Sequence, residues 1–357
     1  MVTAGRRFVA AAAGLALAVG CGAPPPPTPA DRVLRGDAFG TRWLVRLRGP
    51  APADLVAVRS AIEAELDDVD RAMSSWRADS EISRLNASDE LAVPVSAPLA
   101  EVLEASLAIH SASGGALDVT IAPLLRLFGF GPDGDPASAA PAPEAVEEVR
   151  ARMGSARLAL DRSAGGPAVL RRAVPGIEVD LSAVAKGYAV DRVSARLSAL
   201  GSREHLVEVG GEIAVRGRFR VGVEPPLPWL PEAAAPGGAA PVHRSLPVQN
   251  EALATSGGYR DFRPASGTDA RGVWTHILDP RAARPVERAR GSVTVIAPTC
   301  LEADAWATAL YVLGPEEGLA LATGREIAAL FLTAGPDGQI LETTTPTFPL
   351  RTGNPGS

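Results

Sequence analysis

Apolar and polar positions alternate with two different spacings along this chain, one typical of helices and one typical of strands. Apolar residues three or four positions apart predict helices over residues 54–73, 80–86, 98–113, 144–153, 182–200, 299–313 and 315–321. Short alternating or β-branched stretches predict strands near residues 41–48, 176–180, 206–209, 218–223, 273–278, 291–296 and 327–333. Because these elements do not follow a regular strand–helix–strand order, we expect an α+β fold with mixed helices and largely antiparallel sheets.

The first 20 residues have the pattern of a signal peptide. Arg6 and Arg7 precede an apolar run over residues 8–20, which is too short to span a bilayer of about 30 Å as a helix. The run ends in small residues directly before Cys21, an arrangement that resembles a bacterial lipoprotein cleavage site. We therefore expect export, with Cys21 lipidated and the protein anchored to the outer, periplasmic side of the membrane. An ordinary signal peptide followed by an incidental Cys is the alternative.

The rest of the chain is interpreted as one folded unit between two short ends. Residues 21–32 are rich in Pro and predict an extended tether that follows the lipidated Cys. Residues 33–350 contain all the predicted elements. Their two Pro/Gly/Ala-rich stretches, 131–143 and 225–241, predict surface loops within one domain. Residues 351–357 form a C-terminal tail.

The composition excludes several classes of protein and of site. The formal net charge is −6, from 41 acidic and 35 basic residues, which argues against a basic surface that binds nucleic acid. Two Cys, and four His without a metal-binding spacing, exclude Cys-based zinc sites and His-rich metal centres. The phosphate-loop and nucleophile-elbow motifs are absent. Lys186 is the single lysine, and its compact ammonium is not interchangeable with a guanidinium at a tight site.

The predicted helix 299–313 carries a polar pair on an otherwise apolar surface. Asp304 and Thr308 are four residues apart, so they project from the same face. No Lys or Arg lies at helical spacing from Asp304 on this helix. A hard cation such as Mg²⁺, which prefers oxygen ligands, would satisfy both groups. The alternative is a structural pair, in which Asp304 caps a neighbouring loop and Thr308 bonds back to its own helix.

Two further stretches place polar side chains where a predicted strand ends. Asp180 ends one strand and Lys186 lies in the first turns of the next helix, so helix N–H groups and an ammonium could bind a phosphate there. A plain capped helix is the alternative. His276 ends another strand, three residues before Asp279, and could act as a general base. A structural His is the alternative at this position.

Taken in order, eight stretches of the sequence resemble the ApbE family of bacterial flavin transferases. They extend along nearly the whole chain after the tether and cover residues 39–43, 73–86, 115–124, 180–188, 209–212, 255–259, 276–280 and 303–310. Each motif is short, but their common order and spacing make the resemblance specific. It implies a single large ApbE-like, T-fold-like catalytic domain.

The resemblance also implies an activity, a cofactor and partners. Members of this family transfer the FMN moiety of FAD to a Thr or Ser hydroxyl of a target flavoprotein, release AMP and require Mg²⁺. Acceptors are expected among the flavoprotein subunits of membrane redox complexes. The implied metal ligands are Asp304, Thr308 and the backbone carbonyl of Ala183, and the implied base is His276. The implied FAD contacts are Phe39, Trp76, Ala116, Leu117, Asp118, Asp180, Lys186 and Leu278.

This chain departs from the family pattern at a few positions. Trp76 stands where a Tyr is common, and Phe128 and Phe219 stand where a Trp is frequent. Ala283 replaces a Gly in the turn after His276; if the backbone there has a positive φ, Ala costs about 1 kcal/mol. Two other functions stay open at this point. The same site could hydrolyse FAD to FMN and AMP, or the protein could be an exported lipoprotein that binds FAD without turnover.

Overall fold

The computed structural model describes residues 31–49, 54–134, 140–162, 166–226, 242–258, 262–264, 273–286, 291–335, 337 and 339–349. The predicted signal peptide, Cys21, nearly all of the tether and the C-terminal tail lie outside these residues. Among the described helices, none combines the length and the apolarity that a membrane span requires.

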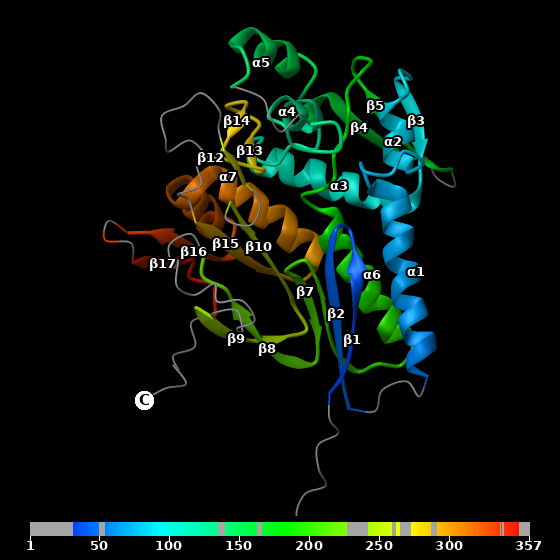
Figure 1. Cartoon of the computed structure of the whole chain (residues 1–357), viewed down its shortest axis with the longest axis vertical. Helices are drawn as coiled ribbons and strands as arrows, with labels where there is room; N and C mark the ends of the chain where they lie inside the picture. Colours follow the sequence, from blue (N-terminus) through cyan, green and yellow to red (C-terminus); the bar gives the residue numbers. More distant parts are fainter. Residues whose placement is uncertain are drawn as a thin grey trace, which may run out of the picture.

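A single antiparallel sheet forms the centre of the molecule (Figure 1). Each neighbouring pair of strands in it is antiparallel. The fold is therefore α+β with antiparallel pairing, as expected from the sequence. Across the sheet the order is β1 (Arg32–Ala38), β2 (Thr41–Arg48), β6 (Glu204–Val209), β7 (Glu212–Arg216), β10 (Ala252–Gly257), β15 (Ser292–Ala297), β16 (Ala328–Ala334) and β17 (Ile340–Thr344).

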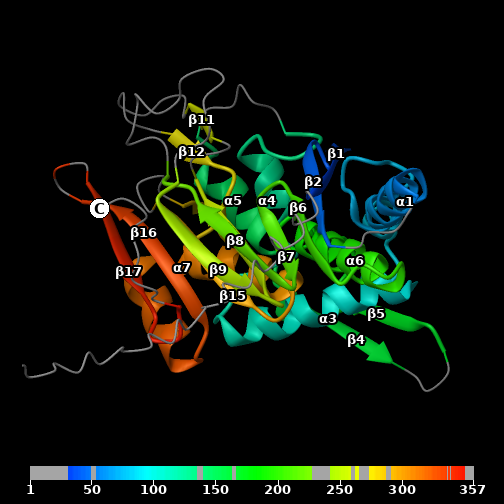
Figure 2. The ribbon, with the colours of Figure 1, turned by 90° about the horizontal axis from the view of Figure 1, so that it is seen from below.

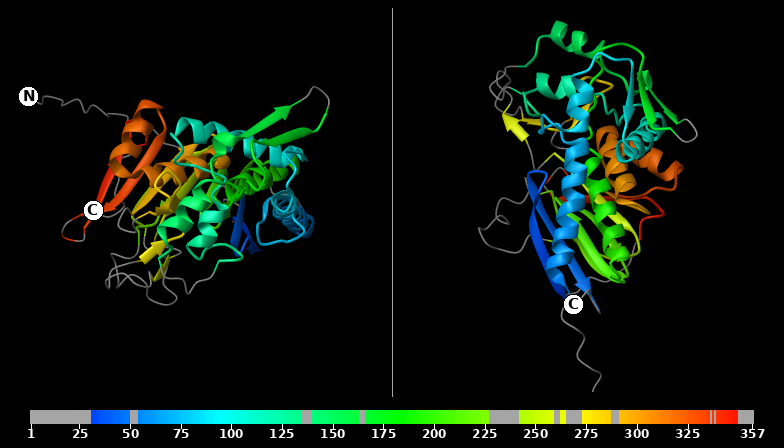
Figure 3. Two further views of the ribbon diagram at one scale, coloured as in Figure 1. Left: turned by 90° about the horizontal axis from the view of Figure 1, so that it is seen from above. Right: turned by 90° about the vertical axis from the view of Figure 1, so that its right-hand side faces the viewer.

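Helices cover one face of this sheet. α6 (Ala185–Ala199) packs on β6 and β7, α7 (Cys300–Gly324) packs on β10 and β15, and the two helices contact each other. α1 (Leu55–Met73) lies beside α6 and β1 (Figure 3, right), and α3 (Ala97–Ala112) contacts α7. The main core lies between these layers. α7 is interrupted at Gly314, whose φ of 82° and ψ of −179° are not helical, which explains why the sequence predicts two helices here.

The opposite face of the sheet is covered by a hairpin of β8 (Arg218–Val223) and β9 (Arg244–Gln249) (Figure 2). Phe219 is buried beneath this hairpin in a second apolar cluster, with Leu330 and Phe348. The guanidinium of Arg48 lies 4.2 Å from the centre of the Phe219 ring. The Phe219 ring, although smaller than the Trp that is frequent at this position in the family pattern, is thus fully packed.

Smaller elements surround the helical side of the sheet. Phe128 is buried in a third apolar cluster between two of them, α4 and α5. The helices are α2 (Glu81–Asn86), α4 (Ala122–Leu127), α5 (Pro143–Arg150) and the single 3₁₀ turn Ser155–Arg157. The strands are β3 (Ala92–Val95), β4 (Leu158–Arg162) and β5 (Ala168–Arg172) in one small sheet, β11 (Phe262–Pro264) with β12 (Val273–Thr275), and β13 (Leu278–Asp279) with β14 (Arg284–Pro285).

The predicted strand 176–180 is wrong, because none of the described strands pairs with these residues. Their extended backbone is held instead by a side chain. The amide of Asn86 donates to the Val179 carbonyl at 2.8 Å, and its oxygen accepts from the Val179 N–H at 2.8 Å. The Asp180 N–H donates to the carbonyl of Val119 at 2.7 Å. One amide side chain therefore replaces a neighbouring strand.

Two other boundaries differ from the expectation. The helix predicted from residue 182 begins at Ala185, because residues 182–184 form a turn. The strand predicted over 273–278 is divided into β12 and β13, and His276 and Ile277 lie between them. Both differences lie beside the site described next.

Candidate active site

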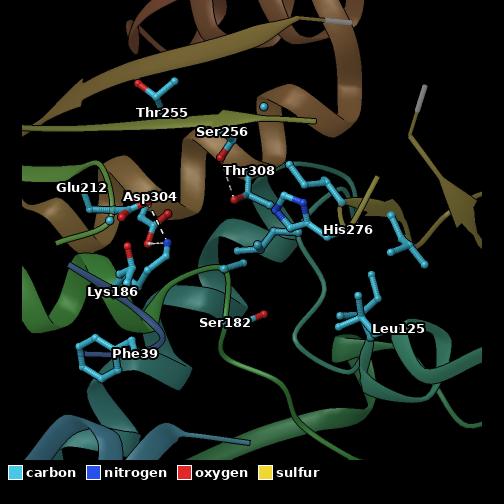
Figure 4. A pocket seen from close by; sticks show the side chains of 18 of the residues that line it. Phe39, Leu125, Ser182, Lys186, Glu212, Thr255, Ser256, His276, Asp304 and Thr308 are labelled. Carbon is cyan, nitrogen blue, oxygen red and sulfur yellow. Dashed lines mark hydrogen bonds and ion pairs between the residues drawn. The ribbon is translucent and has the colours of Figure 1, made fainter. Parts of the chain in front are cut away.

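An open pocket with a volume of about 510 Å³ lies among α6, α7, the ends of β7 and β10 and the surrounding loops (Figure 4). All of the motif stretches except 73–86 contribute side chains or backbone to its lining. The residues come from the β1–β2 turn, the loop after α3, the start of α6, the β6–β7 turn, β10, the 276–278 segment and α7. The fold therefore gathers segments that are far apart in the sequence.

A cluster of one half-buried base and two buried acids forms one wall of the pocket. The Lys186 ammonium lies 2.8 Å from Oε1 of Glu212 and 3.8 Å from Oδ2 of Asp304. Burial by itself would lower the pKa of Lys186, but the negative charges of Asp304 and Glu212 outweigh it and raise this pKa. The side chain of Asp304 is buried, which raises its pKa to about 7, although Lys186 acts in the opposite direction. Two acids facing one ammonium leave an excess of negative potential at this wall.

The position of Asp304 depends on a close contact between α6 and α7. The Gly187 N–H donates to Oδ2 of Asp304 at 3.0 Å. A Cβ at Gly187 would lie 2.4 Å from the Cys300 carbonyl oxygen, so only Gly permits this approach. One turn further along α6, the carboxylate of Asp191 accepts from the N–H groups of Cys300 and Leu301, at 2.8 and 2.9 Å. Burial raises the pKa of Asp191 to about 6.

Thr308 lies one turn after Asp304 on the pocket side of α7, as the spacing predicts. Its hydroxyl is 3.1 Å from the hydroxyl of Ser256 on β10. Asp304, Thr308 and Ala183 all line the pocket and offer a carboxylate, a hydroxyl and a backbone carbonyl. In the described part of the chain no group of three or more His, Cys, Asp or Glu could hold a metal ion. An oxygen set with a single carboxylate fits Mg²⁺, which keeps waters and binds phosphate oxygens.

His276 lies across the pocket from Lys186 and Glu212, beside Thr308 (Figure 4), and Leu278 also lines the pocket. The buried hydroxyl of Thr275 lies 3.0 Å from the carbonyl of Ile277 and 2.9 Å from that of Val286, so the chain on both sides of His276 is anchored. His276 is half-buried and lines the same pocket as Thr308. The ring is therefore accessible from the pocket, as a base would have to be.

Comparison with known proteins shows the family to which the chain belongs. A model of the ApbE family matches residues 39–331. The chain belongs to the ApbE family. Among curated relatives, the FAD:protein FMN transferases of Klebsiella pneumoniae strain 342 and Escherichia coli K12 are each 34% identical, over 86% and 85% of this chain and 85% of each relative.

Solved structures of ApbE proteins share the fold. The flavin transferase ApbE from Vibrio cholerae superimposes with a TM-score of 0.73 at 31% identity, over 89% of this chain and 98% of that one. The apo form of the Pseudomonas stutzeri flavinyl transferase ApbE superimposes with a TM-score of 0.76 at 32% identity, over 89% and 95%. The single ApbE-like domain expected from the sequence is thus confirmed.

The turn after His276 explains the most unusual departure from the ApbE pattern. Ala283 has a φ of 50°, in the region that favours Gly, and it is 2% exposed. Its methyl group packs in the third apolar cluster with Leu278. Arg281 braces the turn by an ion pair with Asp279 at 3.1 Å, and although burial would raise the pKa of Asp279, this pairing lowers it. The buried methyl offsets part of the backbone strain.

The loop that contains Ala116, Leu117 and Asp118 lines the pocket, but the Asp118 carboxylate accepts hydrogen bonds from the protein itself. It accepts from the Thr120 N–H at 2.8 Å, and from the hydroxyl and N–H of Ser155 at 2.7 and 3.1 Å. Asp118 therefore shapes the backbone that faces the pocket. Its contact with FAD stays a prediction.

Two of the predicted FAD contacts lie outside this pocket. Asp180 accepts from the N–H and the hydroxyl of Ser182, so it caps the turn before α6 instead of the helix itself. Asp180 borders an adjacent small pocket that also contains Arg126 and Glu178. The side chain of Trp76 is 72% exposed and lines neither pocket. Their roles in binding FAD stay predictions.

Sequence reasoning assigned no role to two residues that the structure places at the centre of the site. Glu212 pairs with Lys186, and Ser256 bonds to Thr308. Both belong to Gly-containing stretches that resemble the family pattern, 209–212 and 255–259, from which no site residue was predicted. The sequence signal that could have identified them is the polar residue that stands next to the glycines in each motif.

Proposed function

We propose that this chain transfers the FMN moiety of FAD to a Thr or Ser hydroxyl of a target flavoprotein and releases AMP, in a reaction that depends on Mg²⁺. The observation that carries this proposal is the joint lining of one pocket by Asp304, Thr308, Lys186 and His276. The relatives named FAD:protein FMN transferase support the same activity.

The wall of the pocket that contains Asp304, Thr308 and Lys186 would bind the pyrophosphate of FAD. Asp304, Thr308 and the Ala183 carbonyl would hold Mg²⁺. When bound, Mg²⁺ neutralises charge on the pyrophosphate and makes AMP a better leaving group. Lys186 would pair with a phosphate oxygen as a point charge. The ion pairs of Lys186 with two buried carboxylates hold its ammonium in place before the substrate arrives.

His276 would act on the acceptor. Its ring nitrogen takes the proton of the acceptor Thr or Ser hydroxyl as the hydroxyl oxygen attacks the phosphorus of the FMN half. The new bond joins the acceptor oxygen to this phosphorus, and the bond that breaks links the phosphorus to the bridging oxygen of the anhydride. The electron pair of that bond leaves with AMP.

The proposed location of the acceptor rests on the N-terminal segment. The predicted signal peptide, Cys21 and the Pro-rich tether favour a lipid-anchored enzyme on the outer, periplasmic side of the membrane. Flavoprotein subunits of membrane redox complexes are the acceptors that this location favours.

Two variants test the assignment of roles. Asp304→Ala should abolish Mg²⁺-dependent release of AMP, whereas His276→Ala should still bind FAD but lose transfer. Asp161→Ala is a matched control, because Asp161 forms an exposed ion pair with Arg171 in the small sheet. Full activity of Asp304→Ala would refute the metal assignment. Release of AMP and free FMN without labelled acceptor would favour hydrolysis of FAD instead.

A further inference from the structure

Glu212 has one carboxylate oxygen whose partner is missing. The residue begins β7 and is 4% exposed. Oε1 accepts from the Lys186 ammonium at 2.8 Å, but Oε2 is buried and has no hydrogen-bond partner among the described residues. A buried carboxylate oxygen without a donor is unfavourable, because it has lost its bonds to water. Since Glu212 lines the pocket, a bound molecule could supply the donor.

Only a glycine at position 210 keeps side-chain atoms away from Oε2. Gly210 lies next to it, and a Cβ at this position would lie 3.4 Å from Oε2 and 2.9 Å from Cγ2 of Thr41. Gly210 has a φ of +63°, which also favours glycine. Thr41 and Gly210 line the same pocket as Glu212. The β1–β2 and β6–β7 turns therefore meet beside Oε2 in the lining of the pocket, and we call this corner the Glu212 recess (Thr41, Gly210, Glu212).

We infer that the Glu212 recess binds a sugar hydroxyl of FAD close to the pyrophosphate, with Oε2 of Glu212 as the acceptor. This inference rests on the proposed function. Phosphate oxygens offer no proton at neutral pH, and the carboxylate repels them, so the recess does not bind the pyrophosphate itself. The Lys186 ammonium lies against the other oxygen of the same carboxylate and is the cation available to phosphate.

The covalent structure of FAD limits which groups can reach the recess. Each phosphate of FAD is attached to a carbon chain that carries hydroxyl groups, the ribityl chain on one side and the ribose on the other. A hydroxyl a few bonds from the phosphate can therefore reach Glu212 while the phosphate contacts Lys186. By accepting a proton donor and rejecting a phosphate, Glu212 specifies how the dinucleotide is placed along the pocket.

A thermodynamic cycle that combines one protein variant with two analogues of FAD tests this inference. The protein variant is Glu212→Gln, which keeps an oxygen for Lys186 but offers an N–H₂ in place of the acceptor. The ligands are FAD, an analogue without the ribityl hydroxyl nearest the phosphate, and an analogue without the ribose hydroxyl nearest the phosphate. The dissociation constants are measured by flavin fluorescence at fixed Mg²⁺. Glu208→Gln is the matched control, because Glu208 lies on the same hairpin but outside this pocket.

We expect Glu212→Gln to weaken FAD binding about 10- to 100-fold, the usual effect of losing a hydrogen bond to a charged group. One analogue should lose a similar factor with the wild-type protein, and Glu212→Gln should bind that analogue as it binds FAD. The analogue that loses affinity identifies the ribityl chain or the ribose as the source of the hydroxyl. Glu208→Gln should bind all three ligands like the wild type.

Two results would overturn the inference while the proposed function stands. In one, Glu212→Gln binds FAD as tightly as the wild type does. In the other, the variant weakens FAD and both analogues by the same factor, which means that Glu212 acts only through Lys186. The analogue measurements on the wild-type protein need no variant, so a folding defect in Glu212→Gln does not prevent the test. If the wild-type protein binds no FAD, the proposed function fails and this inference fails with it.

Discussion

Replacing Gly187 with Ala should separate the two helices that form the acidic wall of the pocket. The added Cβ would lie 2.4 Å from the carbonyl oxygen of Cys300, 2.8 Å from its carbonyl carbon and 2.9 Å from Cβ of Asp304. These atoms are backbone or Cβ atoms, so no flexible side chain can move aside. Because ordinary contact begins near 3.4 Å, the helices must separate by about 1 Å.

Three contributions determine the change in the free energy of unfolding. Ala is the better helix former and stabilises α6 by about 1 kcal/mol. Overpacking between two helices costs about 1–3 kcal/mol. Stretching the 3.0 Å bond from the residue 187 N–H to Asp304 costs about 1.5–3 kcal/mol, because its acceptor is charged and buried. The two costs prevail, so Gly187→Ala should lower the free energy of unfolding by about 1.5–5 kcal/mol.

Urea unfolding and steady-state kinetics measure the two consequences. A displacement of about 1 Å between Lys186 and Asp304 should also reduce turnover about 100-fold, since catalysis depends on the placement of both. Gly324→Ala is the matched control: Gly324 ends α7 with no atom within 4 Å of an added Cβ, so stability should rise by up to about 1 kcal/mol and turnover should not change. Equal effects of the two substitutions would refute the argument from helix contact.

Three further predictions concern the same pocket. Phe39 has a φ of 52° in the β1–β2 turn, a conformation that Asn tolerates better. Phe39→Asn should therefore leave the free energy of unfolding within about 1 kcal/mol of the wild type, but weaken FAD binding about tenfold in a fluorescence titration. Unchanged FAD affinity would contradict this prediction. Ser256→Ala removes the group that orients the Thr308 hydroxyl, so calorimetry should show Mg²⁺ affinity about tenfold weaker, with recovery in Ser256→Thr; full affinity in the Ala variant would exclude this role. Because burial raises the pKa of Asp304 to about 7, from 3.8 in the unfolded chain, the metal-free protein should lose stability as pH rises from about 4 to 7. Mg²⁺ needs the ionised carboxylate, so its affinity should fall about tenfold per pH unit below 7, and a flat profile would refute this assignment.

Local patterns in the sequence predict most helices because their signals lie within one turn or two. Ser80 and Thr299 accept from the N–H groups of Ser83 and Glu302, as side chains at helix starts do. The six-residue helix α4 has no such side-chain cap, and sequence reasoning missed it. The segment 176–180 was misinterpreted because its partner is the amide of Asn86, which no strand pattern reveals.

The residues of the candidate site likewise fall into two groups, those that a local pattern predicts and those that only the tertiary fold brings together. Asp304 and Thr308 are found from their spacing, since one helix places both. The bonds of Lys186 to Glu212 and of Ser256 to Thr308 join residues 26 and 52 positions apart, and only the tertiary fold brings them together. Gly187 likewise carries no local sign that it faces another helix. The resemblance to the ApbE family supplied the site as a set because its motifs record this tertiary arrangement.

The mass of an acceptor protein tests the central claim most directly. A candidate acceptor flavoprotein domain is incubated with this protein, FAD and Mg²⁺, and a parallel sample contains EDTA. The intact mass of the acceptor domain is then measured. The account predicts a metal-dependent gain of one FMN unit on a Thr or Ser, which is lost with Asp304→Ala. An acceptor of unchanged mass, together with release of AMP and free FMN, would contradict transfer to protein.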